Sequence, residues 1–266
     1  MGGGLTIQGI NTDITIDVNG DYDGFNVSDV KTCTIRDLTI DISDIDTSTL
    51  SAISVAEINN HFVQIENVRI LGNTSYDGRG ITIQSDNVQV EDCHISQTDC
   101  GIYVQSGVSS NVIITNNSII DCGGRLIDCY GNRSSIAGNF FNGTQGNLVT
   151  VLSGNNNTFT YNQLKGNVDT CLWINGGDFN SISYNKILGT VINEGIATNT
   201  GITIGNDADN NIFVGNLVTN FKNIGFEDGW GVFVSEPNCN NTYFIGNIIS
   251  DNDVNLVDQG TDTYIN

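Results

Sequence analysis

A short phrase repeated along the chain limits the fold more than any other feature of the sequence. One copy runs from Ile182 to Ile187 (ISYNKI): an apolar residue, two variable residues, Asn, one variable residue and a second apolar residue. Six copies place this Asn at positions 117, 139, 162, 185, 216 and 247, which are 22, 23, 23, 31 and 31 residues apart. Such a period is typical of a repeat protein in which each repeat packs on its neighbours.

Each repeat reads as three short strands joined by turns. The first strand has an apolar-x-apolar pattern, as in Ile81 and Ile83 or Ile202 and Ile204. This period of two predicts that the apolar residues point inward and the residue between them points outward. The second strand ends at the repeated phrase, and the third begins directly after its Asn. We therefore predict an all-β chain of about ten coils that buries its apolar sides by stacking coil on coil.

The Asn of the phrase is predicted to lie inside the coils. Equivalent side chains in successive coils are about 4.8 Å apart, so stacked amides can hydrogen-bond one another and the backbone of the bend. The early coils carry Leu38, Val68 and Cys93 at this position. The predicted structural ladder consists of Asn117, Asn139, Asn162, Asn185, Asn216 and Asn247.

Repeats such as the one from Asn180 to Ile187 resemble the parallel β-helix repeats of the pectin-lyase-like superfamily, including its tailspike-like and adhesin-like members. The resemblance extends from about Leu5 to Val257 and is specific for fold, because the superfamily includes lyases, hydrolases, epimerases, tailspikes and adhesins. It implies a single-stranded right-handed parallel β-helix with three parallel sheets. We expect one domain over residues 1–266, a rod roughly 48 Å long, in which residues 1–4 are a cloning remnant or disordered.

Charge and composition exclude several classes of partner. The net charge is −21, which disfavours nucleic acid and anionic membranes. No run of 18 apolar residues occurs, so membrane insertion is not expected, and no basic segment precedes an apolar core as in a signal peptide. We expect an extracellular, cell-surface or virion-surface protein that is either exported after trimming or carried on a virion.

The outward column of the first strands is the predicted place for a ligand. It reads Asn26, Ser54, Thr82, Tyr103, Asp128, Thr150, Trp173, Thr203 and Phe233. Aromatic side chains on a rigid sheet suit stacking on sugar rings, although loops or a neighbouring subunit could equally cover them. The predicted glycan-binding residues are Tyr103, Trp173, Trp230, Phe233, Glu227 and Asp228.

Catalysis at this column would depend on Asp128, its one carboxylate. A glycosidase needs two facing carboxyl groups, so the partner would come from a loop, as Asp99 or Asp169 could. No Lys or Arg lies in the column to serve a lyase, and the motifs of polygalacturonases are absent. The sequence therefore favours a non-enzymatic structural or adhesin β-helix with a glycan-facing side. The alternative is a polysaccharide-degrading tailspike or lyase-like enzyme that acts on the first-strand face.

Calcium is the one cofactor that the sequence suggests. Asn19, Asp21 and Asp23, followed by Gly24, match the first half of a calcium-binding loop. The acidic residue expected at the twelfth position is replaced by Val30, so an EF-hand is excluded.

The last coils predict a protein partner. Outward positions that are polar in earlier coils become apolar there, and a continuous apolar face usually marks an interface. The predicted interface residues are Ile212, Val214, Leu217, Tyr243, Ile245 and Ile248. We expect these coils to pack against a second copy of the chain or a missing neighbouring domain.

Overall fold

The computed structural model describes residues 5–9, 15–18, 23–28, 32–45, 47, 49–56, 62–107, 109–143, 150–166, 169–192, 199–223 and 228–266. All regular elements in these residues are strands. Among the same residues, no helix is long and apolar enough to cross a membrane. The chain forms two compact units, residues 1–135 and 136–266, and each is described by itself.

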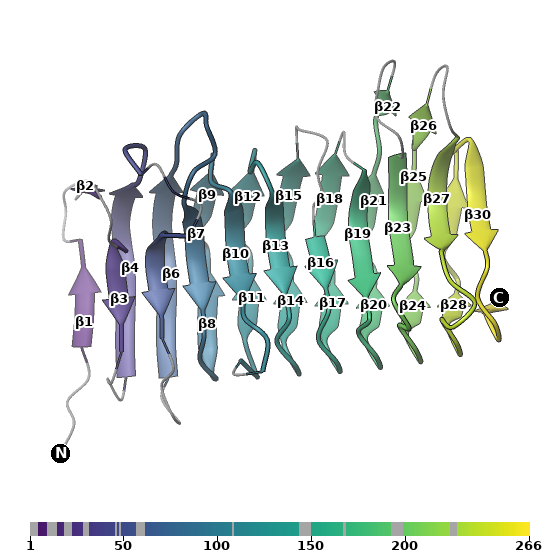
Figure 1. Cartoon of the computed structure of the whole chain (residues 1–266), viewed down its shortest axis with the longest axis horizontal. Coiled ribbons are helices and arrows are strands. Elements are labelled where there is room, and N and C mark those ends of the chain that lie inside the picture. Colours follow the sequence, from purple (N-terminus) through teal and green to yellow (C-terminus); the bar gives the residue numbers. More distant parts are fainter. Residues whose placement is uncertain are drawn as a thin grey trace. The chain divides into compact units, whose positions relative to one another are not determined.

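The first unit contains one parallel sheet made of the first strands of its coils (Figure 1). Its inward residues Ile53, Ile81 and Ile102 are in register and fully buried. The sheet runs in the order β3 (Phe25–Val27), β5 (Ser51–Val55), β7 (Arg79–Ile83), β10 (Cys100–Val104) and β13 (Arg125–Cys129).

The second and third faces of this unit differ between early and later coils. The strands are β1 (Leu5–Gln8), β2 (Thr15–Asp17), β4 (Thr32–Asp41), β6 (Phe62–Leu71), β8 (Val88–Glu91), β9 (His94–Ser96), β11 (Ile113–Thr115) and β12 (Ser118–Ile120). β4 and β6 each continue for 10 residues across both faces, because backbone pairing runs through the apolar bend at Leu38 and Val68. At the later bend Asn117 Oδ1 accepts a hydrogen bond from Cys93 N at 2.9 Å. A side-chain amide thus takes over from backbone pairing, and the strand divides into two.

The second unit repeats the coil with three separate strands. The first strands pair in the order β16 (Thr150–Leu152), β19 (Thr170–Asn175), β23 (Asn199–Gly205), β27 (Gly229–Val234) and β30 (Val254–Asp258). The second strands are β17 (Thr158–Thr160), β20 (Ser181–Ser183), β24 (Ile212–Val214), β28 (Tyr243–Ile245) and β31 (Tyr264–Ile265), and β14 (Ser135–Ala137) crosses the unit boundary. The third strands are β15 (Phe140–Gly143), β18 (Gln163–Gly166), β21 (Lys186–Leu188), β25 (Leu217–Thr219) and β29 (Ile248–Ser250).

Side-chain amides hold the bends of the second unit together. Asn139 donates from its backbone N and from Nδ2 to Asn162 Oδ1, both at 2.9 Å. The same double contact links Asn162 to Asn185, Asn185 to Asn216, and Asn216 to Asn247. A second ladder, which the sequence analysis missed, links Asn157, Asn180 and Asn211 at another turn. These amides satisfy backbone donors at bends where the strands cannot pair.

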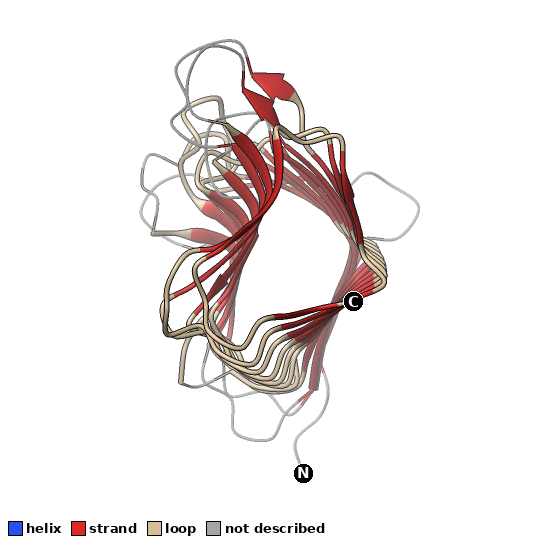
Figure 2. Cartoon of the chain, turned by 90° about the vertical axis from the view of Figure 1, so that its right-hand side faces the viewer, coloured by secondary structure: helices blue, strands red, loops and turns tan. Residues whose placement is uncertain are grey.

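Strands lie on the sides of the coils and turns lie at their corners (Figure 2). The predicted all-β fold of stacked coils with parallel strands is confirmed. Two longer loops of the second unit also pair with each other, through β22 (Val191–Ile192) and β26 (Lys222–Asn223). Asn199 Nδ2 donates to Thr190 O and Lys222 O, both at 3.0 Å, and so fastens both loops to the first-strand face.

Candidate functional site

A cleft of ≈ 270 Å³ opens on the first-strand face of residues 1–135. It contains Asp128, the carboxylate that the sequence singles out in the outward column. The remaining lining residues are Arg79, Asp99, Cys100, Tyr103, Gly124 and Arg125.

Strand register explains how these residues meet. Tyr103 lies beside Asp128 on neighbouring strands β10 and β13, so both project outward from the same part of the sheet. Arg79 and Arg125 begin β7 and β13, and both are in register with Cys100 at the start of β10. The cleft therefore has a cationic edge where the strands begin and a Tyr–Asp edge three residues further along.

Asp128 is the best-defined polar group of the cleft. Its side chain is buried, with the residue 5% exposed, and Arg125 Nη1 donates a hydrogen bond to Oδ2. The other oxygen, Oδ1, is buried and has no hydrogen-bond partner among the described residues. Burial raises the pKa of Asp128, while the charge of Arg125 and its hydrogen bond oppose that rise. A buried carboxyl oxygen without a donor is costly, and this cost disfavours the ionised form of Asp128.

Tyr103 forms the aromatic wall of the cleft. The guanidinium carbon of Arg79 lies 4.4 Å from the centre of the Tyr103 ring, a cation–π contact. Tyr130 meets the same ring edge-on, with centroids 6.1 Å apart. Burial is also the main cause of a raised pKa at the Tyr103 phenol. The ring is thus held in one orientation by two neighbours.

Asp99 supplies a second carboxyl group to the same cleft. Burial raises its pKa, and the charges of Arg79 and Arg125 oppose the rise. Gly124 lies against it: a Cβ at this position would stand 2.9 Å from Asp99 Oδ1. Two acids with burial-raised pKa values therefore share one cleft with two arginines.

The sequence analysis missed Arg79 and Arg125. Each stands three residues before an outward residue, so strict alternation assigns it to the inside. The first residue of each strand instead lies at a corner, where it is only half buried while the next residues are fully buried. The available signal was the recurrence of Arg at the same place in two coils.

The other predicted glycan-binding residues lie in the second unit. Trp173, Thr203 and Phe233 are in register on β19, β23 and β27. Trp230 packs on Phe233 with centroids 4.6 Å apart, and Trp173 Nε1 is buried without a partner among the described residues. Asp228 is exposed, and Glu227 lies outside the described residues.

The predicted outward position of Thr150 is wrong. Thr150 pairs with the inward residue Leu172, and Val151 pairs with the outward Trp173. This strand is therefore shifted by one residue, which moves every side chain to the opposite face.

The predicted calcium ligands are Asn19, Asp21 and Asp23. Asn19 and Asp21 lie outside the described residues, and Asp23 Oδ1 accepts a hydrogen bond from Ser51 N at 2.8 Å. Within the part of the chain that is described, no group of three or more His, Cys, Asp or Glu side chains could hold a metal ion.

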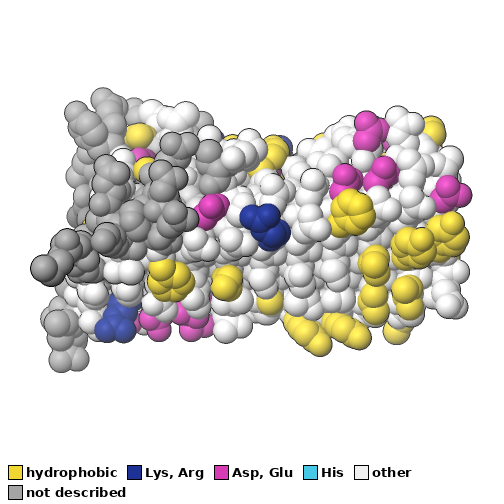
Figure 3. Space-filling model, turned by 90° about the horizontal axis from the view of Figure 1, so that it is seen from below, with side chains coloured by type: hydrophobic (Ala, Val, Ile, Leu, Met, Phe, Trp, Pro, Cys, Tyr) yellow, Lys and Arg dark blue, Asp and Glu magenta, His cyan; other side chains and the backbone are white. Residues whose placement is uncertain are grey.

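An apolar face covers the last coils of the second unit, and Figure 3 shows hydrophobic side chains gathered over these C-terminal strands. Ile212, Ile245 and Ile248 are 41%, 46% and 60% exposed, while Val214, Leu217 and Tyr243 are half buried. Tyr243 stacks on Tyr264 at 4.7 Å, which extends the face by a residue that the sequence analysis did not include.

Comparison with known proteins gives a family and a set of folds. The sequence profile described as "Right handed beta helix region" matches residues 3–187. No curated protein sequence matches the chain.

Three solved structures are similar in fold. A tailspike protein mutant of E. coli bacteriophage HK620, in complex with a pentasaccharide, has a TM-score of 0.68 and 11% identity over 95% of this chain and 53% of its own. The A-module of the Azotobacter vinelandii mannuronan C-5 epimerase AlgE6 has a TM-score of 0.59 and 9% identity, covering 100% of this chain and 90% of its own. A DFA-IIIase from Arthrobacter chlorophenolicus A6, in complex with GF2, has a TM-score of 0.58 and 16% identity over 88% and 68%. The chain spans about half the length of the tailspike, and identities this low show a shared fold alone.

Proposed function

Because the chain belongs to the right-handed β-helix family, we propose that it is a carbohydrate-binding β-helix whose ligand occupies the Asp128 cleft. The observation that carries this proposal is that one cleft brings together Asp128, two arginines and the Tyr103 ring, which its neighbours hold in place. A sugar supplies hydroxyl groups, which can hydrogen-bond the charged side chains that line this cleft.

Tyr103, beside Asp128 on the neighbouring strand, suits the apolar face of a sugar. Tyr103 offers a ring held by Arg79 and Tyr130, and aromatic rings stack on the apolar faces of sugar rings. The two arginines donate to ring or hydroxyl oxygens. Trp173, Trp230 and Phe233 are proposed as a second aromatic surface for sugar contact in the second unit.

The structural relatives fit this proposal. One is a tailspike bound to a pentasaccharide, and others include a mannuronan epimerase. By analogy we place the protein on the surface of a virion or a cell, where it serves as a structural rod and adhesin. Its apolar face over Ile212, Ile245 and Ile248 would join a second copy or a neighbouring domain.

A second candidate function is cleavage of the bound polysaccharide. It is favoured by Asp99 and Asp128, which line one cleft and both have a pKa raised by burial. A glycosidase needs one carboxylic acid to protonate the leaving oxygen and one carboxylate to act on the other side of the bond. Arg79 and Arg125 lie near both groups and can keep one of them ionised.

A glycan array combined with a reducing-sugar release assay separates the two functions. Binding without release supports the adhesin. Release that is abolished in Asp128→Asn supports the enzyme. Absence of binding to any polysaccharide contradicts both.

A further inference from the structure

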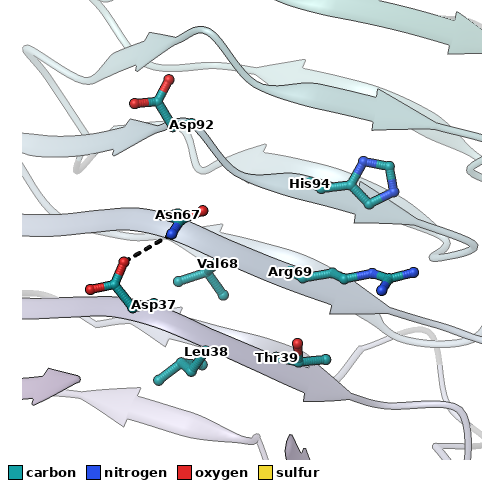
Figure 4. A pocket seen from close by; sticks show the side chains of 8 residues that line it. All are labelled: Asp37, Leu38, Thr39, Asn67, Val68, Arg69, Asp92 and His94. Carbon is teal, nitrogen blue, oxygen red and sulfur yellow. Dashed lines mark hydrogen bonds between the residues drawn. The ribbon is translucent and has the colours of Figure 1, made fainter. Parts of the chain in front are cut away.

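A second pocket, of ≈ 350 Å³, lies in the first unit over the bend between the second and third faces (Figure 4). The apolar bend residues form part of its lining. On one edge stand Thr39, Arg69 and His94, and on the other stand Asp37, Asn67 and Asp92. None of these residues lines the Asp128 cleft.

The first edge is a column of hydrogen-bond donors. Thr39 is in register with Arg69, and Arg69 with His94, on strands β4, β6 and β9. Ser118 on β12 follows His94 in the same register. Neighbouring strands are about 4.8 Å apart, so consecutive side chains of the column can reach one bound group. The column contains no carboxylate, although the chain has 30 Asp and Glu residues.

Arg69 is available to a ligand. Its side chain is exposed and has no hydrogen-bond or ion-pair partner among the described residues. Burial is the main cause of a lowered pKa at His94, and the charge of Arg69 lowers this pKa further. A guanidinium and an imidazole whose protonation it disfavours therefore lie side by side without an intervening acid, and a bound anion would offset that effect.

The opposite edge is a column of acceptors in the left-handed backbone region. Asp37, Asn67 and Asp92 have φ values of 58°, 50° and 53°. Asn67 Nδ2 donates to Asp37 Oδ1 at 2.9 Å, which fixes that part of the edge. The Asp92 carboxylate is exposed and has no partner in the described part of the chain, so it can accept from a ligand hydroxyl.

We propose that this pocket binds a sugar sulfate or sugar phosphate, with Arg69, His94 and Thr39 donating to the tetrahedral oxyanion and Asp92 accepting from a hydroxyl. The planar fork of a guanidinium matches two oxygens of such an ester, and charge-assisted hydrogen bonds of this kind are about twice as strong as neutral ones. The proposal does not depend on the function of the Asp128 cleft, since the two sites share no residue.

Binding is tested by NMR of the histidine side chains. The chain has two His residues, so His94→Gln identifies the signal of His94. Glucose 6-sulfate and glucose 6-phosphate are titrated into the intact protein, with glucose and glucuronate as comparisons. The esters are expected to raise the measured pKa of His94, because a bound anion stabilises the imidazolium form. Glucose is expected to leave it unchanged.

Variants show whether ester binding depends on this pocket or only on the positive charge of exposed arginines. Arg69→Gln should weaken binding about tenfold or more, and Arg69→Lys should give an intermediate affinity because it keeps the charge without the fork. Arg133→Gln removes an exposed arginine of the same unit outside the pocket and should bind as the native chain does. The proposal is overturned if the esters leave the His94 pKa unchanged, if glucuronate binds as well as they do, or if Arg133→Gln weakens binding as much as Arg69→Gln.

Discussion

Arg125 donates a hydrogen bond to one oxygen of Asp128, while the other oxygen of the same carboxylate is buried without a partner among the described residues. Both residues of this pair line the proposed carbohydrate-binding cleft. The strand register of β10 and β13 places it beside Tyr103, and the resulting cleft gives a ligand both a polar and an aromatic contact.

The first prediction concerns the cost in folding stability of ionising the buried Asp128 side chain at neutral pH. The pKa of Asp128 is raised in the folded state. The protonated carboxyl therefore stabilises the fold fully at a pH below the unfolded-state pKa, near 3.8, and this stabilisation is lost as the pH rises through the folded-state pKa. Asp128→Asn never ionises and should therefore unfold at a higher temperature than the native chain at pH 7. At pH 3 the two should unfold at the same temperature. Calorimetry at both pH values checks this, and a variant less stable at pH 7 would contradict it.

The second prediction concerns the Asn ladder. Asn162→Ala removes the acceptor for two donors of Asn139 and the donor to Ile136 O. We expect a loss of roughly 3 kcal/mol in the free energy of unfolding, because buried groups are left unsatisfied. Thr158→Ala, an exposed position of the same coil, is the matched control and should change stability little. Equal effects of the two substitutions in denaturant titrations would show that the ladder is not stabilising.

The third prediction concerns Phe179, which is 59% exposed and has a φ of 56°. The equivalent positions Asn156 and Asn210 have nearly the same φ, and Asn tolerates the left-handed region better than Phe. Phe179→Asn should therefore stabilise the chain by about 0.5–1 kcal/mol. A measured loss of stability would mean that the ring makes a contact worth more than the backbone strain.

The fourth prediction concerns the apolar face of the last coils. A double change, Ile245→Asp with Ile248→Asp, places two charges on the most exposed part of this face. If the face joins two copies, light scattering should give an oligomer for the native chain and a monomer for the variant. Phe179→Asn, which removes an exposed apolar residue outside the predicted interface, should leave the oligomer intact. A native chain that is monomeric at all concentrations excludes self-association through this face.

Much of the fold follows from the repeated phrase alone. The period-two pattern predicts the inward residues of the first strands because a buried strand leaves little freedom of register. The pattern fails at Thr150, where a one-residue shift exchanges the faces of the strand. The pattern also predicts two separate strands where the structure has one, in both β4 and β6. These strands stay continuous because Leu38 and Val68 permit a bend without interrupting backbone pairing.

The candidate site was less accessible from the sequence. Asp128 and Tyr103 could be predicted from alternation, and Asp99 was named as one source of a second carboxylate. Arg79 and Arg125 could not, because alternation does not describe the corner residue that begins a strand. The pocket of Arg69 and His94 was missed because its residues come from three coils, and nothing in one coil marks it.

The central claim is that the Asp128 cleft binds carbohydrate, and a glycan array probed with three proteins tests it most directly. The native chain should bind a defined set of glycans, and Tyr103→Ala should weaken that binding about tenfold, because it removes the aromatic wall. Arg133→Gln, a surface change outside the cleft, should bind as the native chain does. Undiminished binding by Tyr103→Ala, or no binding by the native chain, would contradict the claim.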